Sequence, residues 1–161
     1  MVKPTIIANM GEGELGKTES IKMVYEKLRQ VADGEPVHKN PNQENQKDIC
    51  AWLMINKEKV GIASDGDTQA IVRDNLNFLT NAECSIILTA SRNNHDMVCL
   101  LNEYEKQYRI WRTSNARLFE QNTHPRVAPK GMLKRFNENW AEEIANLIES
   151  WCYAEKEENK K

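Results

Sequence analysis

The residues best suited to chemistry lie together near the N-terminus, in the run Gly11-Glu12-Gly13-Glu14-Leu15-Gly16-Lys17-Thr18. Gly11 and Gly16 allow the backbone to bend and to approach a ligand without a Cβ in the way. The backbone N–H groups that precede Thr18 are expected to point inward as a nest for an anion, which a following helix N-terminus extends with its partial positive charge. Lys17 adds a mobile positive charge, and the Thr18 hydroxyl suits Mg²⁺. This combination favours a phosphate group as the ligand.

The run matches G-x-x-x-x-G-K-[ST] at every fixed position, and it resembles the Walker A motif of the P-loop NTPase superfamily. The resemblance implies that a nucleoside triphosphate binds along the whole run from Gly11 to Thr18. It also implies that Lys17 reaches the β- and γ-phosphates, where it acts in catalysis, and that Thr18 is a ligand of Mg²⁺. The resemblance covers this loop and the general order of strands and helices, and it identifies no subfamily.

Four residues stand at positions that the motif leaves variable, and their types bear on the kind of loop. Glu12 and Glu14 are expected to point to solvent, where screening limits their repulsion of the phosphates. Gly13 and Leu15 bring the loop closer to GTPase-like loops than to those of many small-molecule kinases. All four still belong to the predicted nucleotide-binding loop.

A second polar segment, Ser64-Asp65-Gly66-Asp67, follows a short apolar run. By the same resemblance, Asp65 or Asp67 is expected to serve Mg²⁺ and catalysis from the end of a neighbouring strand, with the Gly66 amide near the γ-phosphate. The alternative is that Asp67 caps the next helix and Asp65 is a turn residue. The sequence does not choose between the two carboxylates.

Arg92 closes another apolar run, after Thr89-Ala90-Ser91. A guanidinium at the edge of the sheet would neutralise charge that develops on a transferring phosphoryl group, which makes Arg92 a candidate catalytic residue. A surface arginine after a strand is the equally weighted alternative.

The segment 109–135 has a local formal charge of +6, because Glu120 is its only acid. It either clamps ATP or an anionic acceptor, as a kinase lid does, or faces an acidic helix as a solvated surface, which is the favoured interpretation. No recognition module with interleaved aromatic residues surrounds it, which argues against nucleic acid as a partner. Its bases are Arg109, Arg112, Arg117, Arg126, Lys130, Lys134 and Arg135, and the opposing acids are Glu138, Glu142, Glu143 and Glu149.

Strands and helices are expected to alternate around these residues, because apolar runs of 4–7 residues alternate with segments of helical periodicity. The pattern predicts a three-layer α/β/α sandwich like that of P-loop NTPases. Its sheet would hold about five strands in all, mostly parallel and including one antiparallel hairpin strand, with the ligand at the carboxyl ends of the parallel strands. The expected strands are 5–9, 49–55, 60–63, 85–90 and 108–113; the expected helices begin at 17 and cover 68–79, 96–108 and 137–153, and 33–48 is expected to be a long loop.

Length and composition agree with one domain over 1–153 and a charged, disordered tail over 154–161, since 161 residues suit a single core. A net charge of −2 argues against a protein built to grip nucleic acid or an anionic membrane. No apolar run approaches the ~20 residues of a spanning helix, and no secretory leader is evident, so a cytoplasmic location is expected. The four cysteines are widely spaced and are interpreted as reduced core thiols, and zinc is not expected.

Two sequence elements of GTPases are missing, and their absence bears on which nucleotide is bound. The N-K-x-D element of guanine-specific GTPases is missing, because the comparable string Asn56-Lys57-Glu58-Lys59 lacks its aspartate. The segment 33–48 contains no Ser or Thr that would close on Mg²⁺. We therefore expect an enzyme that uses Mg-ATP, either hydrolysing it or passing its γ-phosphoryl group to a small acceptor. The alternatives are a nucleotide-dependent switch or assembly module, in which 33–48 becomes ordered on binding, and a relic that only binds an anion.

Overall fold

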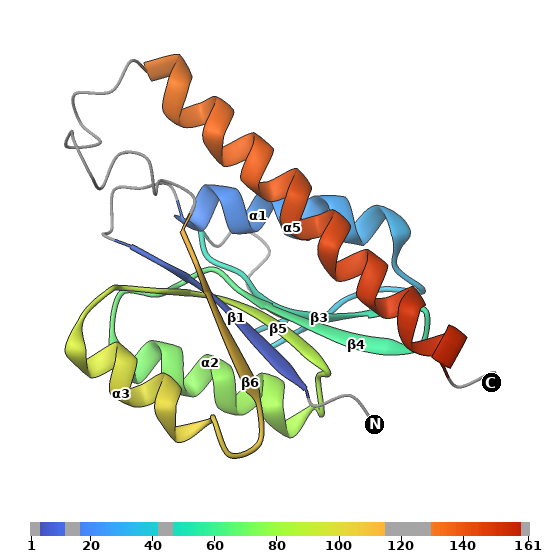
Figure 1. The fold of residues 1–161 in the computed structure, drawn as a ribbon, viewed down its shortest axis with the longest axis horizontal. Helices are drawn as coiled ribbons and strands as arrows, with labels where there is room; N and C mark the ends of the chain where they lie inside the picture. The colour runs from blue at the N-terminus through green and yellow to red at the C-terminus, as the bar shows by residue number, and fades with distance from the viewer. Residues whose placement is uncertain (1–3, 12–16, 42–46, 115–129, 159–161) are drawn as a thin grey trace.

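A mixed sheet forms the centre of the chain in its computed structural model, which describes residues 4–11, 17–41, 47–114 and 130–158 (Figure 1). The described residues form six strands in the order β2-β3-β4-β5-β1-β6. The strands β4, β5, β1 and β6 are parallel, β3 pairs antiparallel with β4, and β2 pairs antiparallel with β3. Their bounds are β1 Thr5–Met10, β2 Val37–His38, β3 Cys50–Ile55, β4 Glu58–Ala63, β5 Ile86–Ser91 and β6 Arg109–Thr113.

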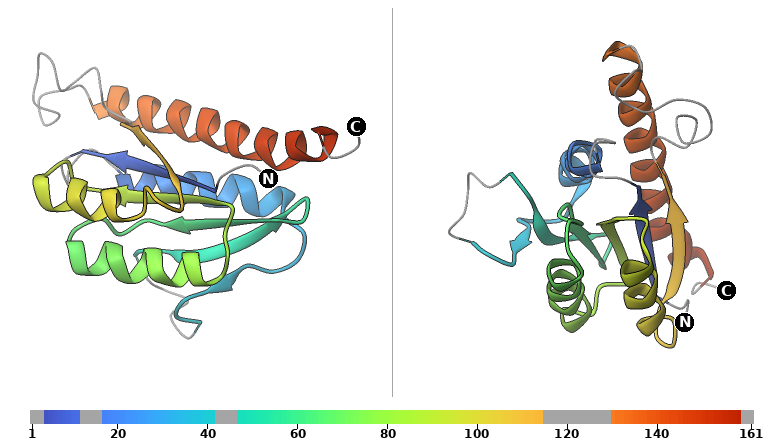
Figure 2. Two further views of the ribbon diagram at one scale, coloured as in Figure 1. Left: turned by 60° about the horizontal axis from the view of Figure 1, so that its bottom comes forward. Right: turned by 90° about the vertical axis from the view of Figure 1, so that its left-hand side faces the viewer.

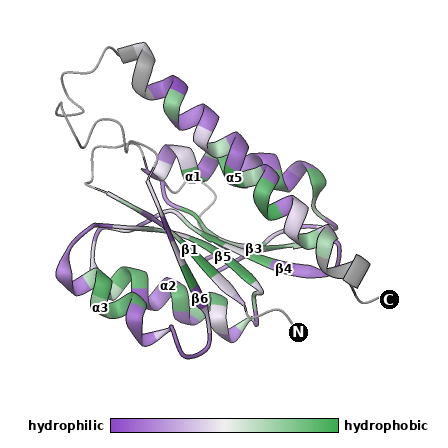
Figure 3. Ribbon diagram, in the orientation of Figure 1, coloured by the Kyte–Doolittle hydropathy of each residue, from purple (hydrophilic) through white to green (hydrophobic). Residues whose placement is uncertain are grey.

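Helices cover both faces of the sheet. α1 and α5 lie on one face, and α2 and α3 lie on the other (Figures 1 and 2). The side chains of β1 alternate accordingly, since Ile7 joins the core cluster of α1 and α5, whereas Ile6 and Ala8 join that of α2 and α3. Hydrophobic residues concentrate between the layers, and α5 turns many polar residues outward (Figure 3). The helix bounds are α1 Lys17–Val31, α2 Gln69–Asn81, α3 His95–Glu103 and α5 Lys130–Glu158.

The predicted α/β class and mostly parallel sheet are confirmed, with one more strand than expected. β2 lies inside the segment 33–48 that was predicted to be loop. It contains only Val37 and His38, which pair with Trp52 and Ala51, so it depends on β3 for its backbone hydrogen bonds. A strand of two residues leaves no hydrophobic alternation in the sequence, which is why the pattern missed it.

The strand order differs from the expectation in one respect that matters for the site. β5 pairs with both β1 and β4, so the strand that precedes Asp65 is not a neighbour of β1. The prediction that these carboxylates follow a neighbouring strand of β1 is therefore wrong, because β5 fills that place. Strand order depends on long-range pairing, which local patterns do not encode.

Two helices have other bounds than predicted. α3 ends at Glu103 instead of 108, because the backbone N–H of Tyr104 caps it by bonding to carbonyls of the last turn. α5 begins seven residues before the expected start at 137, and it includes residues 154–158 of the predicted tail. No described helix is long and apolar enough to cross a membrane.

The cysteines are only partly core residues. All four lie in the described ranges, and none of them forms a disulfide. Cys84 and Cys152 are buried, Cys50 is half-buried and Cys99 is exposed. The expectation of a core thiol is wrong for Cys99, which lies on the outer face of α3 with its Sγ 3.5 Å from Nε2 of His95.

Candidate functional site

The first part of the site joins β1, β5 and the start of α1 through Lys17. β1 leads into Gly11, whose φ of 151° favours glycine, and α1 begins at Lys17. Only 6 % of Lys17 is exposed, and its Nζ donates hydrogen bonds to the carbonyls of Gly11 (2.5 Å) and Ser91 (3.0 Å). The Gly11 amide also donates to the Ser91 carbonyl. The Lys17 amine is thereby held at the carboxyl ends of two adjacent parallel strands.

Burial changes the acidity of this amine. The pKa of Lys17 is lowered from 10.5 to about 8, mainly by burial and also by the positive charge of Arg92, while the negative charge of Asp67 opposes both. The three side chains therefore share one electrostatic environment. The remaining residues of the predicted loop, Glu12, Gly13, Glu14, Leu15 and Gly16, lie outside the described residues.

A cluster of oxygen atoms surrounds the hydroxyl of Thr18, one residue further along α1. Its Oγ1 lies 3.5 Å from Oδ1 of Asp48 and 3.4 Å from the Ser64 carbonyl. The Ser64 hydroxyl donates to the same Asp48 oxygen at 3.1 Å and accepts from the Ile49 amide at 2.7 Å. We call Thr18, Asp48 and Ser64, together with Asp65, which is affected by the charge of Asp48, the Thr18 cluster.

Asp48 is a member that the sequence analysis missed. It ends the polar segment 33–48, which carries no recognisable motif. The hairpin register pairs Cys50 with Ala63, and continuing that register places Asp48 opposite Asp65. The hairpin was predicted from the sequence, so its register was the signal that pointed to Asp48.

Asp65 lies in a more negative and more buried environment than an ordinary surface carboxylate. Burial raises its pKa, and the nearby charges of Asp48 and Asp67 raise it further, while a hydrogen bond from the Asp67 amide opposes the change. That amide donates to Oδ1 of Asp65 at 3.1 Å. Of the two candidate carboxylates, Asp65 therefore shares its surroundings with Asp48 beside Thr18.

Asp67 and Arg92 form a separate pair. Their side chains approach to 3.2 Å, and both are largely exposed. The interpretation of Asp67 as the cap of the next helix is wrong, because Thr68 caps α2 by accepting a hydrogen bond from the Ile71 amide. The structure thus places Asp67 with Arg92 and within electrostatic reach of Lys17.

Gly66, which stands between Asp65 and Asp67, allows the turn that carries both carboxylates to approach the end of β5. A Cβ atom at Gly66 would lie 2.6 Å from the Ala90 carbonyl carbon and 2.7 Å from the Ser91 amide nitrogen. The turn after β4 therefore packs directly against the backbone at the end of β5. Only glycine allows this approach without a shift of one backbone segment.

The oxygen donors of the Thr18 cluster suit a hard cation such as Mg²⁺. The Asp48 carboxylate and the Ser64 carbonyl each lie within 3.5 Å of the Thr18 hydroxyl. Among the described residues, no group of three or more His, Cys, Asp or Glu side chains could hold a metal ion. Mg²⁺ would therefore take its remaining ligands from substrate phosphates and water, as it commonly does.

Asn9 is a buried polar residue whose side-chain amide is not satisfied by any contact within the described fold. It is fully buried on β1, two residues before Gly11, and neither its side-chain oxygen nor its nitrogen has a hydrogen-bond partner among the residues that the structure describes. An unsatisfied buried amide costs about 1–3 kcal/mol. We expect Asn9→Leu to raise the free energy of unfolding by about 1–2 kcal/mol in a urea titration, because it removes these polar atoms and keeps a similar volume.

A matched control is Asn75→Leu on α2. Asn75 is also buried, but its Oδ1 accepts a hydrogen bond from Lys39 at 3.0 Å, so this variant should lose stability. A loss of stability in Asn9→Leu as well would show that the Asn9 amide has a partner, such as a water molecule.

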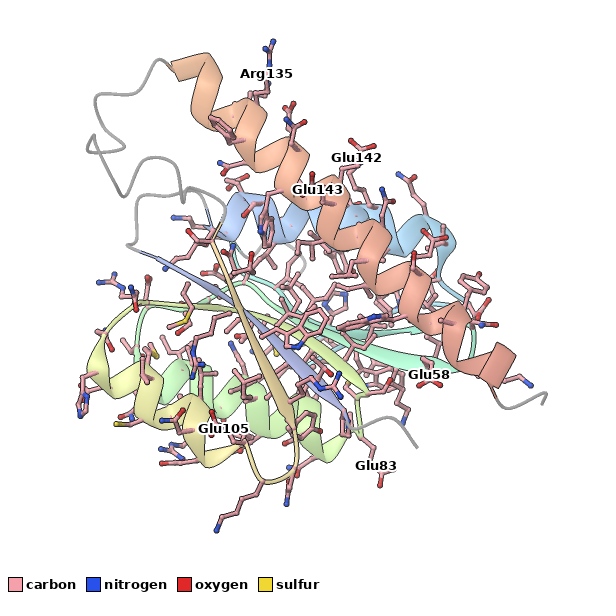
Figure 4. The ribbon with its side chains drawn as sticks, in the orientation of Figure 1. Glu58, Glu83, Glu105, Arg135, Glu142 and Glu143 are labelled. Atoms are coloured by element: carbon pink, nitrogen blue, oxygen red, sulfur yellow. The ribbon has the colours of Figure 1, made fainter. Side chains whose placement is uncertain are left out.

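The basic segment 109–135 is described only at its two ends. Arg112 approaches Glu105 at 3.9 Å and donates to Asn102, and Lys134 approaches Glu138 at 3.9 Å. Figure 4 shows Arg135 and Glu142 on α5 pointing away from the sheet. The described bases thus lie on a solvated surface with acids nearby, while Arg117 and Arg126, and with them the lid interpretation, fall outside the described residues.

Comparisons of the chain with protein-family models, with curated proteins and with solved structures gave no match.

Proposed function

We propose that the chain binds Mg-ATP through the run from Gly11 to Thr18 and either hydrolyses it or transfers its γ-phosphoryl group to a small acceptor. The observation that supports this most is the position of Lys17. Its buried amine is held by two carbonyls at the carboxyl edge of the sheet, at the first residue of a helix. Parallel sheets bind ligands at that edge, and helix N-termini favour anions.

Each described residue of the site has a role in this proposal. Lys17 exchanges its two carbonyl partners for phosphate oxygens and offsets their charge. Thr18 with Asp48 or Asp65 would hold Mg²⁺, which neutralises charge on the phosphates when bound. Arg92, now paired with Asp67 at 3.2 Å, lies close enough to Lys17 for its charge to affect the pKa of that amine, and it supplies positive charge as the phosphoryl group is transferred.

The test is to measure the melting temperature of the purified chain with ATP, with and without Mg²⁺, beside phosphate release. We expect ATP to raise the melting temperature, more strongly with Mg²⁺, because a ligand that binds only the folded state stabilises it. At a concentration of 100 times Kd the gain is about 2.7 kcal/mol. Absence of any rise at millimolar ATP would refute the proposal.

We expect Thr18→Ala to shift the Mg²⁺ dependence of this stabilisation. The variant removes one oxygen of the Thr18 cluster, and the half-saturating Mg²⁺ concentration should rise at least tenfold, in keeping with losses of about 10–100-fold around metal sites. The control is Thr80→Ala on α2, whose hydroxyl donates to the Asn77 backbone carbonyl and to no other group in the described part of the chain. A normal Mg²⁺ titration in Thr18→Ala would remove Thr18 from this role.

One observation favours a second candidate, the nucleotide-dependent switch. Asp48 connects the end of the segment 33–48 to Thr18 and Ser64, so a ligand at Thr18 acts directly on that segment. Strong stabilisation by ATP without phosphate release, with or without acceptors, would favour the switch over the enzyme.

A further inference from the structure

A cavity of about 630 Å³ opens beside the Thr18 cluster. Its size lies within the usual range of about 300–1,000 Å³ for small-molecule sites. α1, the segment around β2, the start of β3 and the first half of α2 form its walls. The residues that matter below are Lys22, Tyr25, Arg29, His38, Asp48 and Asp65.

One end of the cavity is formed by Asp48 and Asp65, the two carboxylates of the Thr18 cluster. In the proposed function, Lys17 and Thr18 mark the γ-phosphate end of the triphosphate. The cavity therefore opens at the phosphoryl group that is transferred. A molecule bound there has access to the γ-phosphorus and to a carboxylate that accepts a proton.

The other end follows α1 and is positively charged. With a rise of 1.5 Å per residue, Lys22, Tyr25 and Arg29 lie about 6, 10 and 16 Å along the helix from Thr18. The Tyr25 hydroxyl lies 3.4 Å from Nε2 of His38, so these two side chains form one polar wall. The midpoint between Lys22 and Arg29 lies about 11 Å along α1 from Thr18, which suits a molecule about 10 Å long.

The charges at this end differ in how far they are already neutralised. Lys39 pairs with Asp74 and donates to Asn75. Among the described residues, Arg29 has only a 4.0 Å contact with Glu35, and this interaction is weak because both side chains are exposed. Lys22 forms no ion pair with any residue that the structure describes. Glu26 is the one acid on this stretch of α1, and it also lines the cavity.

Building on the proposed function, we propose that this cavity binds the phosphoryl acceptor, and that the acceptor is a small hydroxyl compound carrying a phosphate or carboxylate. Its anionic group lies at Lys22, His38 and Arg29, and its hydroxyl lies at Asp48 and Asp65. The hydroxyl oxygen forms a bond to the γ-phosphorus while the bond from that phosphorus to the β–γ bridging oxygen breaks. ADP leaves with the electron pair, and the hydroxyl proton passes to a carboxylate and then to water.

The experiment uses the full chain with Mg²⁺ and ATP labelled in its γ-phosphate. The probes are nucleoside monophosphates, sugar phosphates and hydroxy acids, each beside its uncharged counterpart. We expect at least one anionic probe to become labelled, at a rate at least tenfold above that of its uncharged counterpart. The same probe should raise the melting temperature when a non-hydrolysable ATP analogue is bound.

The variants Lys22→Glu and Arg29→Glu locate the anionic group. Each should raise the half-saturating concentration of the labelled probe at least tenfold more than that of ATP. The matched control is Lys27→Glu, which makes the same charge change on an exposed position of α1 that does not line the cavity. It should change the probe's half-saturating concentration less than twofold.

Three outcomes would overturn the acceptor proposal: no probe is labelled, the uncharged counterparts react as fast, or the Lys22 and Arg29 variants weaken ATP as much as the probe. The last outcome would place the nucleoside of ATP in the cavity. Each of these outcomes counts against the acceptor proposal only if ATP stabilises the wild-type chain. If ATP gives no stabilisation, the proposed function itself fails, so the two failures are distinguishable.

Discussion

Lys17→Ala is expected to reduce strongly the rise in melting temperature that ATP and Mg²⁺ produce in the wild-type chain. The amine is the one described cation held at the junction of β1, β5 and α1, and a hydrogen bond to a charged group contributes about 1.5–3 kcal/mol. Its loss should weaken ATP binding by about 10–100-fold. Titration of the melting temperature with ATP measures this change.

Because Lys17 is buried, its removal also affects packing. Lys17→Met keeps most of the aliphatic stem and should lose ATP binding to the same extent, while circular dichroism shows that the fold is retained. Lys27→Ala, an exposed position on the same helix, serves as the control. An unchanged ATP affinity in both Lys17 variants would exclude the phosphate site from this end of α1.

Gly66→Ala is expected to destabilise the fold more than other single-methyl additions. The added Cβ would lie 2.6–2.8 Å from three backbone atoms of Ala90 and Ser91, and backbone gives way less readily than a flexible side chain. Overpacking of this kind costs about 1–3 kcal/mol, and we expect the upper part of that range. For a chain of this length it corresponds to a fall of about 5–10 °C in melting temperature.

Gly131→Ala is the matched control for this prediction. A Cβ at Gly131 would meet nothing within 4 Å, and alanine favours helix over glycine by up to about 1 kcal/mol. That variant should be neutral or more stable. Equal stability of Gly66→Ala and the wild type would mean that the turn after β4 moves away from β5 at no cost.

Much of the secondary structure could be predicted from local pattern. β1, β3 and β5 are apolar runs, and α2 carries Val72, Leu76 and Leu79 at helical spacing. Such patterns act within a few residues, because a helix or strand must present one apolar face. The exceptions are β2, which is too short for a pattern, and the ends of α3 and α5, which depend on caps and on neighbouring elements.

The candidate site could be predicted only in part. Lys17, Thr18, Asp65, Asp67 and Arg92 all lie near one edge of the described sheet, as expected from residues that follow parallel strands or begin a helix. Their grouping was not predictable. Asp65 lies with Asp48 by the hairpin register, whereas Asp67 pairs with Arg92, and no local motif separates these partners.

The amino-acid order alone determined the alternation of strands and helices and the clustering of glycine, lysine and threonine at one turn, because these depend on neighbours in the chain. The tertiary structure alone decided that β5 lies between β1 and β4, that Gly66 packs on its end, and that Asp48 reaches Thr18 beside a cavity. Each of these depends on contacts between residues 24–81 positions apart. Such contacts follow from how the whole sheet pairs and buries its faces.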